Sequence, residues 1–123
     1  AIVVATDESE LQSLCPPQRG LYANTTYFAT HHSHRERLDL QLWEGAVSRV
    51  ALFSDGLLSL AMNIEQNRPY TPFFTPLFAF AAEAADSVEA GQALATFLAS
   101  ERVNQRTHDD KTLVLVTRTV PDQ

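Results

Sequence analysis

The chain has 123 residues, which is enough for one domain with a core of its own and too few for two. Hydrophobic residues make up 45% and charged residues 20%, as in soluble globular proteins, so a disordered or low-complexity chain is excluded. The net charge of -6 disfavours binding of nucleic acid by a basic surface, and no apolar run is long enough to predict a membrane span.

The first half of the chain is predicted to consist of strands. Residues 2–5 form an apolar run typical of a strand, and residues 6–20 read as a polar connection. β-branched and aromatic residues predict a second strand over residues 25–30. Leucines alternate over residues 38–43, and a short turn leads from there into the apolar segment 47–53. This short connection predicts that the last two strands form an antiparallel hairpin.

Beyond residue 53 the apolar spacing becomes that of helices. A short helix is predicted just after Asp55-Gly56, with inward residues at Leu57, Leu60, Ala61 and Ile64. Thr71-Pro72 predicts the start of a longer helix, with an N-cap followed by proline at the first helical position. A row of phenylalanines, from Phe73 to Phe80, is expected to form the buried stripe of that helix.

The chain is predicted to end in one more helix and a strand. Asp86, with Glu89 three residues later, predicts the start of the helix. Its inward residues are expected to be Val88, Leu94, Phe97 and Leu98. Residues 112–117 read as a strand that is apolar on both faces at its centre, which predicts that both of its faces are covered.

Two acidic groups stand at matching places in this predicted fold. Asp55-Gly56 follows the strand 47–53, and Asp109-Asp110 precedes the strand 112–117. If those strands are antiparallel neighbours, the end of one lies beside the start of the other, so the carboxylates meet at one edge of the sheet. Carboxylate oxygens gathered in this way usually hold Mg²⁺ or Mn²⁺, and like charges so close would repel one another without a cation.

Each acidic group also has a simpler local interpretation. Ser54-Asp55-Gly56 is compatible with a plain turn, and Asp109-Asp110 with a solvated turn or a charge that protects a strand edge. Other features favour structural roles. We expect His31, His32 and His34 to form a polar loop, Cys15 to be an unreactive thiol in a reducing, cytoplasmic compartment, and the phenylalanine row to be core.

Three segments resemble a known family. Residues 50–57, Val-Ala-Leu-Phe-Ser-Asp-Gly-Leu, resemble the segment of PPM-type (protein phosphatase 2C-like) serine/threonine phosphatases in which an apolar strand ends in Ser/Thr-Asp-Gly. Residues 108–116, which begin His-Asp-Asp-Lys-Thr, resemble the closing motif of that family, Asp-Asn/Asp-x-Thr before an apolar strand. Residues 20–30 are similar to a segment of the bacterial branch. The order and spacing of the three segments together make the resemblance specific.

The resemblance implies an α+β fold, namely a partial four-layer αββα sandwich built on antiparallel sheets with flanking helices. It also implies a centre of two Mg²⁺ or Mn²⁺ ions, with Asp55 and Asp109 as metal ligands and with Gly56 and Asp110 beside them. The implied reaction is hydrolysis of phosphoserine and phosphothreonine in proteins by a metal-activated water, without a phosphoenzyme.

The chain lacks motifs that the family carries in its N-terminal half. That half contributes an acidic residue before an Asp-Gly pair and an arginine for the substrate phosphate, whereas Asp55-Gly56 is the single Asp-Gly pair here. We therefore expect residues 1–123 to be one truncated phosphatase domain, inactive alone, whose partners are a phosphoprotein substrate and the missing N-terminal half. An apolar surface left uncovered is expected to favour self-association.

Two other classes of function remain open at this point. One is a non-catalytic binding or regulatory module that descends from the phosphatases. The other is a receiver-like signalling domain, with Asp55 as phosphoacceptor and Lys111 as its partner. The consecutive strands predicted over residues 20–54 disfavour the receiver-like domain, because that domain alternates strands with helices.

Overall fold

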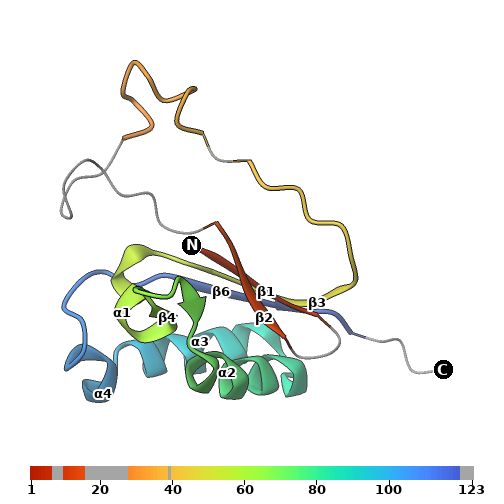
Figure 1. Cartoon of the computed structure of the whole chain (residues 1–123). Helices are drawn as coiled ribbons and strands as arrows, with labels where there is room; N and C mark the ends of the chain where they lie inside the picture. Colours follow the sequence, from red (N-terminus) through yellow and green to blue (C-terminus); the bar gives the residue numbers. More distant parts are fainter. Residues whose placement is uncertain (7–9, 16–27, 39, 120–123) are drawn as a thin grey trace.

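A computed structural model describes residues 1–6, 10–15, 28–38 and 40–119, and its centre is a four-stranded antiparallel sheet (Figure 1). The strands are β1 (Ile2–Thr6), β2 (Leu11–Cys15), β3 (Val47–Phe53) and β6 (Leu113–Thr117), in the spatial order β2-β1-β3-β6. The segments predicted over 2–5, 47–53 and 112–117 are thus confirmed as strands, as is the antiparallel α+β fold class. Within the described ranges, no helix is long and apolar enough to cross a membrane.

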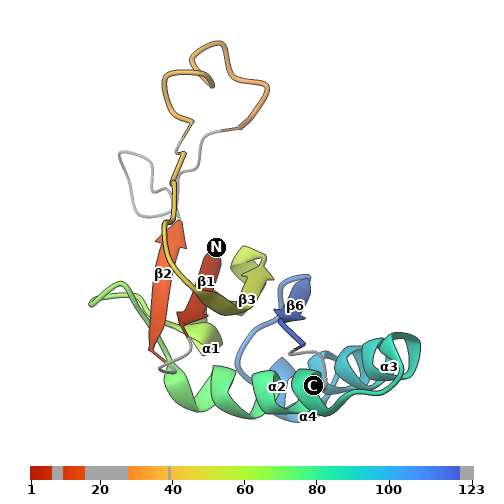
Figure 2. The same ribbon diagram turned by 90° about the vertical axis from the view of Figure 1, so that its right-hand side faces the viewer.

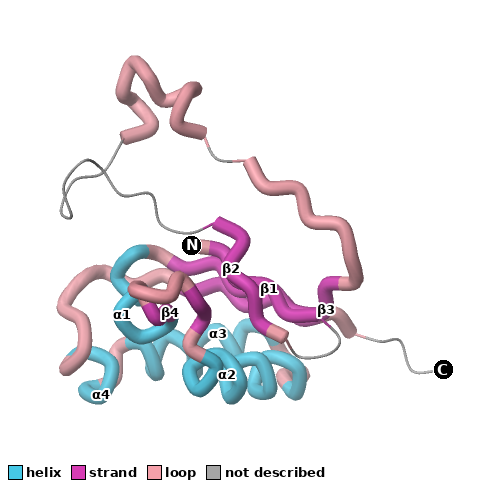
Figure 3. Tube along the Cα trace, viewed as in Figure 1, coloured by secondary structure: helices cyan, strands magenta, loops and turns pink. Residues whose placement is uncertain are grey.

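The helices follow β3 and cover one face of the sheet. In chain order the elements are the 3₁₀ turn η1 (Asp55–Leu57), α1 (Leu58–Ala61), the short strands β4 (Met62–Asn63) and β5 (Arg68–Pro69), α2 (Thr71–Glu83), α3 (Ser87–Leu98) and α4 (Glu101–Asn104). Two views a quarter turn apart show α2, α3 and α4 on the same side of the sheet (Figures 1 and 2). Residues 28–38 and 40–46 extend on the other side (Figure 3).

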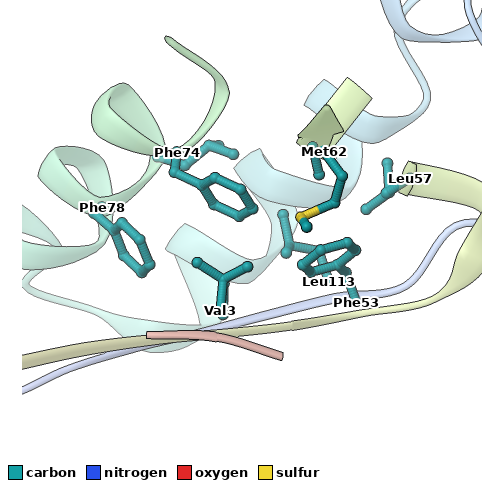
Figure 4. Packing of buried hydrophobic residues seen from close by; sticks show 10 residues of the cluster. Val3, Phe53, Leu57, Met62, Phe74, Phe78 and Leu113 are labelled. Atoms are coloured by element: carbon teal, nitrogen blue, oxygen red, sulfur yellow. The ribbon is translucent and has the colours of Figure 1, made fainter. Parts of the chain in front are cut away.

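The core lies between the sheet and α2. Because side chains alternate along a strand, the register Ala51↔Leu115 and Phe53↔Leu113 puts these residues on the helix-facing side. Phe74 and Phe78 of α2 are fully buried against them, and the Phe74 ring lies 5.8 Å from that of Phe53 (Figure 4). The phenylalanine row is therefore core, as expected, except that Phe80 is 39% exposed.

The predicted hairpin of residues 38–43 with β3 is wrong. Residues 38 and 40–43 are not in a strand, and Leu38, Leu40 and Leu42 are 68%, 83% and 89% exposed. A strand has two hydrogen-bonding edges, and those of β3 are taken by β1 and β6. No edge of β3 therefore remains for the leucine segment. Its alternating leucines form an apolar face that is not covered within the described part of the chain.

Two other predictions for the first half also need correction. A strand was expected over 25–30, of which residues 25–27 lie outside the described residues. Residues 28–30 belong to a turn in which the His31 amide donates to the Phe28 carbonyl at 3.0 Å. The polar connection expected over 6–20 contains β2, which pairs with β1. Because β2 lies at the sheet edge and all its residues are half-buried, it lacks the alternation that marks a strand in the sequence.

The helices differ from their predicted patterns in detail. The first one ends at Ala61, because the chain becomes extended at Met62 to form β4, and Ile64 is left 44% exposed. The N-cap of α2 is Tyr70 rather than Thr71. Asp86 does cap α3, but Val88 points outward and is 69% exposed, whereas Leu94, Phe97 and Leu98 pack against the core.

The outer face of the sheet, opposite the helices, is apolar. Leu52, Val114 and Val116 occupy it and are 39%, 46% and 50% exposed. The prediction that the last strand is covered on both faces is therefore wrong for the described part of the chain. Its helix-facing side is packed, and none of the described helices or strands lies over its outer side (Figure 2).

Asp86 should make the stability of α3 depend on pH. Its Oδ1 accepts hydrogen bonds from the Glu89 amide at 3.0 Å and the Val88 amide at 2.7 Å, which lower the pKa of the carboxyl below its usual range. A lowered pKa in the folded state means stabilisation that is complete above the unfolded pKa and is lost as the pH falls through the folded value. We expect this loss from about pH 4 downward.

The measurement is the difference in free energy of unfolding between the native protein and Asp86→Asn, which keeps a capping oxygen but does not titrate. As the pH falls from about 6 to about 3, the free energy of unfolding of the native protein should decrease relative to that of the variant. A constant difference over this range would contradict the assigned role of the carboxylate.

Candidate metal centre

Pairing of β3 with β6 brings the two acidic groups to the same end of the sheet. Phe53, the last residue of β3, pairs with Leu113, the first residue of β6. One step further out, the Ser54 amide donates to the Thr112 carbonyl at 3.1 Å. The antiparallel pairing on which the hypothesis of a shared site depends is thus present, and the turn that holds Asp55 lies beside the loop that holds Asp109 and Asp110.

Gly56 is the point of contact between the two motifs. It is buried, and a Cβ atom at this position would lie 3.3 Å from the Asp109 Cβ and 3.1 Å from the carbonyl carbon of Asp110. The same Cβ would overlap the carbonyl oxygen of Asp110. The backbone of the first motif therefore packs directly on the backbone of the second, at a distance that only glycine allows.

Side-chain hydroxyls hold the acidic loop against the sheet. The Ser54 Oγ accepts from the Thr112 amide at 3.0 Å and donates to the Asp110 carbonyl at 3.4 Å. From the other side, the Oγ1 of the buried Thr107 accepts from the Asp109 amide at 3.4 Å. From the sequence, Ser54 was expected only as part of a turn or of the Ser-Asp-Gly motif, and no role was expected for Thr107. Their short hydroxyl side chains next to irregular backbone were the available signal.

Three carboxylates are the candidate metal ligands of the site. Asp55, Asp109 and Asp110 are all exposed, so their oxygens are accessible. Next to Asp55, at the end of β3, the Ala1 nitrogen donates to the Phe53 carbonyl at 2.8 Å.

These donors fit a divalent cation as part of a ligand set. Carboxylate oxygen is the donor that Mg²⁺ and Mn²⁺ prefer, and the contact at Gly56 places carboxylate-bearing residues from two separate loops side by side. Within the described residues, no group of three or more His, Cys, Asp or Glu side chains is close enough to hold a metal ion. Asp55, Asp109 and Asp110 therefore do not form a complete metal site within the described part of the chain.

The histidines near residue 31 engage local groups. His31 Nδ1 lies 2.8 Å from the Ser33 Oγ, and His34 Nδ1 lies 2.8 Å from the His31 carbonyl oxygen. His31, His32 and His34 are exposed in a series of turns, in agreement with the polar loop expected from the sequence. Cys15, in β2, is a half-buried free thiol.

Comparison with known proteins identifies the family. A family model described as Protein phosphatase 2C matches residues 1–99, most of the chain. The chain belongs to the protein phosphatase 2C family. The matched range includes Asp55-Gly56 and ends before Asp109. The assignment of residues 108–116 as the closing motif therefore rests on the sequence resemblance and on the contact with Gly56.

A curated relative adds to this assignment. Over 107 residues this phosphatase 2C chain is 42% identical to Serine/threonine-protein phosphatase 3 of Escherichia coli (strain K12). The alignment covers 85% of the chain and 42% of that relative, so the chain spans less than half of the relative's length. No solved structure matches the chain.

The contact at Gly56 predicts that Gly56→Ala is destabilising. The added methyl group would press on the Asp110 carbonyl, which cannot move without breaking the hydrogen bond from Ser54. We expect the free energy of unfolding to fall by about 1–3 kcal/mol, the usual cost of overpacking.

Gly91→Ala is the matched control. Gly91 lies in α3, and a Cβ there would meet nothing within 4 Å. That substitution should raise the free energy of unfolding by about 0.5–1 kcal/mol, because alanine is the better helix former. Equal effects of the two substitutions, measured by chemical denaturation, would refute the tight packing at Gly56.

Proposed function

We propose that the chain is the C-terminal part of a protein phosphatase 2C domain that hydrolyses phosphoserine and phosphothreonine in proteins with the help of Mg²⁺ or Mn²⁺. The observation that carries the proposal is the contact of the Asp55-Gly56 turn with the Asp109-Asp110 loop across the β3–β6 pair. The family match and the similarity to a bacterial serine/threonine-protein phosphatase support the reaction class.

In this proposal Asp55 and Asp109 hold the metal ions, and Gly56 and Asp110 lie beside them. Because the carboxylates are exposed, metal ions bound to them would be accessible to the phosphate of a substrate and to further ligands from the rest of the protein. When bound, the metal ions supply a water of lowered pKa and positive charge that neutralises the phosphate. The chain positions the two loops that carry Asp55 and Asp109, because the sheet and the hydroxyls of Ser54 and Thr107 hold them in place.

The remaining ligands come, in this proposal, from the part of the protein that precedes the chain. The chain spans 42% of the length of its bacterial relative, and within its described residues no group of three or more His, Cys, Asp or Glu side chains is close enough to hold a metal ion. The chain alone should therefore be inactive. A reducing, cytoplasmic location is part of the proposal, because Cys15 is a free thiol.

Asp55→Asn and Asp109→Asn should abolish metal-dependent release of phosphate. The loss of a charged ligand weakens both metal binding and stabilisation of the phosphate, so we expect kcat/KM of the complete protein to fall by at least about a hundredfold. The assay is Mn²⁺-dependent release of phosphate from a phosphothreonine peptide, with Mn²⁺ affinity measured in parallel by calorimetry. Asp86→Asn, on the exposed start of α3, is the control and should retain full activity. Full activity in both site variants would end the metal assignment.

We also propose that the outer face of the sheet packs against the rest of the domain. Leu52, Val114 and Val116 form an exposed apolar face, and the family resemblance implies a second sheet opposite this one. The length of the bacterial relative leaves more than half of a comparable protein to supply that layer. Burial of these side chains would stabilise the complete domain by the hydrophobic effect.

This docking can be tested with a polar isostere. Val114→Thr should lower the free energy of unfolding of the complete protein by about 1–2 kcal/mol, because it buries a hydroxyl without a partner. Val88→Thr, at an exposed valine of α3, should have almost no effect. Equal, small effects would contradict the docking. A dimer of the complete protein that Val114→Thr dissociates would instead assign the face to self-association.

A further inference from the structure

A relay of hydrogen bonds connects the helical layer with the backbone of Asp109. The Nζ of Lys111 donates to the Asn104 Oδ1 at 2.8 Å and to the Asp109 carbonyl at 3.3 Å. At the other end, the Asn104 Nδ2 donates to the Ala99 carbonyl at 3.0 Å. The Asn104 amide thus lies between a carbonyl group and an ammonium group, and each of its ends faces the partner that its chemistry requires.

The relay acts on a stretch of irregular backbone. Residues 107–112 lie between α4 and β6 and belong to no helix or strand, so neither a helix nor a sheet ladder fixes the peptide of Asp109. Ordering such a residue costs about 1–2 kcal/mol of conformational entropy. The fixed points are side chains: Thr107 at the Asp109 amide and Lys111 at the Asp109 carbonyl. Both hydrogen-bonding groups of the Asp109 backbone are therefore held by side chains.

The direction of the Lys111 ammonium is informative. Its two hydrogen bonds go to neutral oxygens, an amide and a backbone carbonyl. A cation that approaches Asp109 and Asp110 from the exposed side therefore meets carboxylates whose backbone is already in place. Lys111 is also the only lysine in the chain.

We propose that Lys111 and Asn104 are positioning residues for the metal centre. They act through the backbone of Asp109 and preset its carboxylate before a metal ion binds, an inference that rests on the proposed function. Groups that orient a metal ligand in this way typically change metal affinity by about 10–100-fold when they are removed. A preset ligand binds more tightly because its ordering cost has been met during folding.

The test measures Mn²⁺ binding by calorimetry in the complete protein and in three variants. Lys111→Met keeps most of the aliphatic stem but removes both hydrogen bonds of the ammonium group. Asn104→Ala removes the Lys111–Asn104 hydrogen bond, which anchors that ammonium group to the helical layer, without a change of net charge. Each should raise the Kd for Mn²⁺ about tenfold. The double variant should match Lys111→Met, since without the Lys111 ammonium Asn104 has no link to the Asp109 backbone. In the metal-free protein, the amides of Asp109 and Asp110 should exchange with deuterium faster in both single variants.

Arg102→Met is the matched control, because Arg102 is exposed on α4 and its removal costs the same charge as that of Lys111. It should leave the Kd unchanged. The inference is overturned if folded Lys111→Met and Asn104→Ala proteins bind Mn²⁺ like the native protein, or if Lys111→Met acts no more strongly than Arg102→Met. If Asp109→Asn weakens Mn²⁺ binding while Lys111→Met and Asn104→Ala do not, this inference alone is overturned. An unaffected Asp109→Asn, or a native protein that does not bind Mn²⁺, would overturn the proposed function with it.

Discussion

The antiparallel pairing of β3 with β6 is the constraint on which the rest of this structure depends. Phe53 and Leu113 meet in this pair, although two long helices separate them in the chain. Their neighbours toward the end of the sheet are the Asp55-Gly56 turn and the Asp109-Asp110 loop. Because the strands run in opposite directions, the exit from one is the entrance to the other. The ladder therefore brings the two acidic groups to the same end of the sheet, where the backbone of Gly56 packs against Asp109 and Asp110.

The core supports this arrangement from one side. Phe74 of α2 packs on Phe53, the residue at which β3 ends, and Leu113 belongs to the same buried cluster. The ends of both strands are thus packed against the core where the acidic loops leave them, and packed elements position functional groups better than loops do. The opposite face of the sheet is apolar and exposed in Leu52, Val114 and Val116. This one-sided burial agrees with a chain that spans less than half the length of its bacterial relative.

Segments whose burial pattern is regular were predictable. Strand β3 was predicted with its observed bounds, and α2 and α3 begin within one residue of their predicted starts. The alternating leucines at residues 38–42 misled the prediction, because alternation shows that a segment can present an apolar face but not which strand edge is vacant. Strand β2 was missed for the opposite reason, since an edge strand with half-buried residues carries little periodic signal.

The amino-acid sequence by itself determined strand β3, the starts of α2 and α3, the Ser-Asp-Gly turn and the acidic loop, because these follow from the spacing of neighbouring residues. It also carried the family resemblance that the comparisons confirm. Tertiary structure alone decided that β3 lies between β1 and β6, which face of the sheet is left open, and that Lys111 reaches both Asn104 and the Asp109 backbone. These features join segments whose relative position depends on how the helices pack on the sheet, and local sequence pattern does not contain that information.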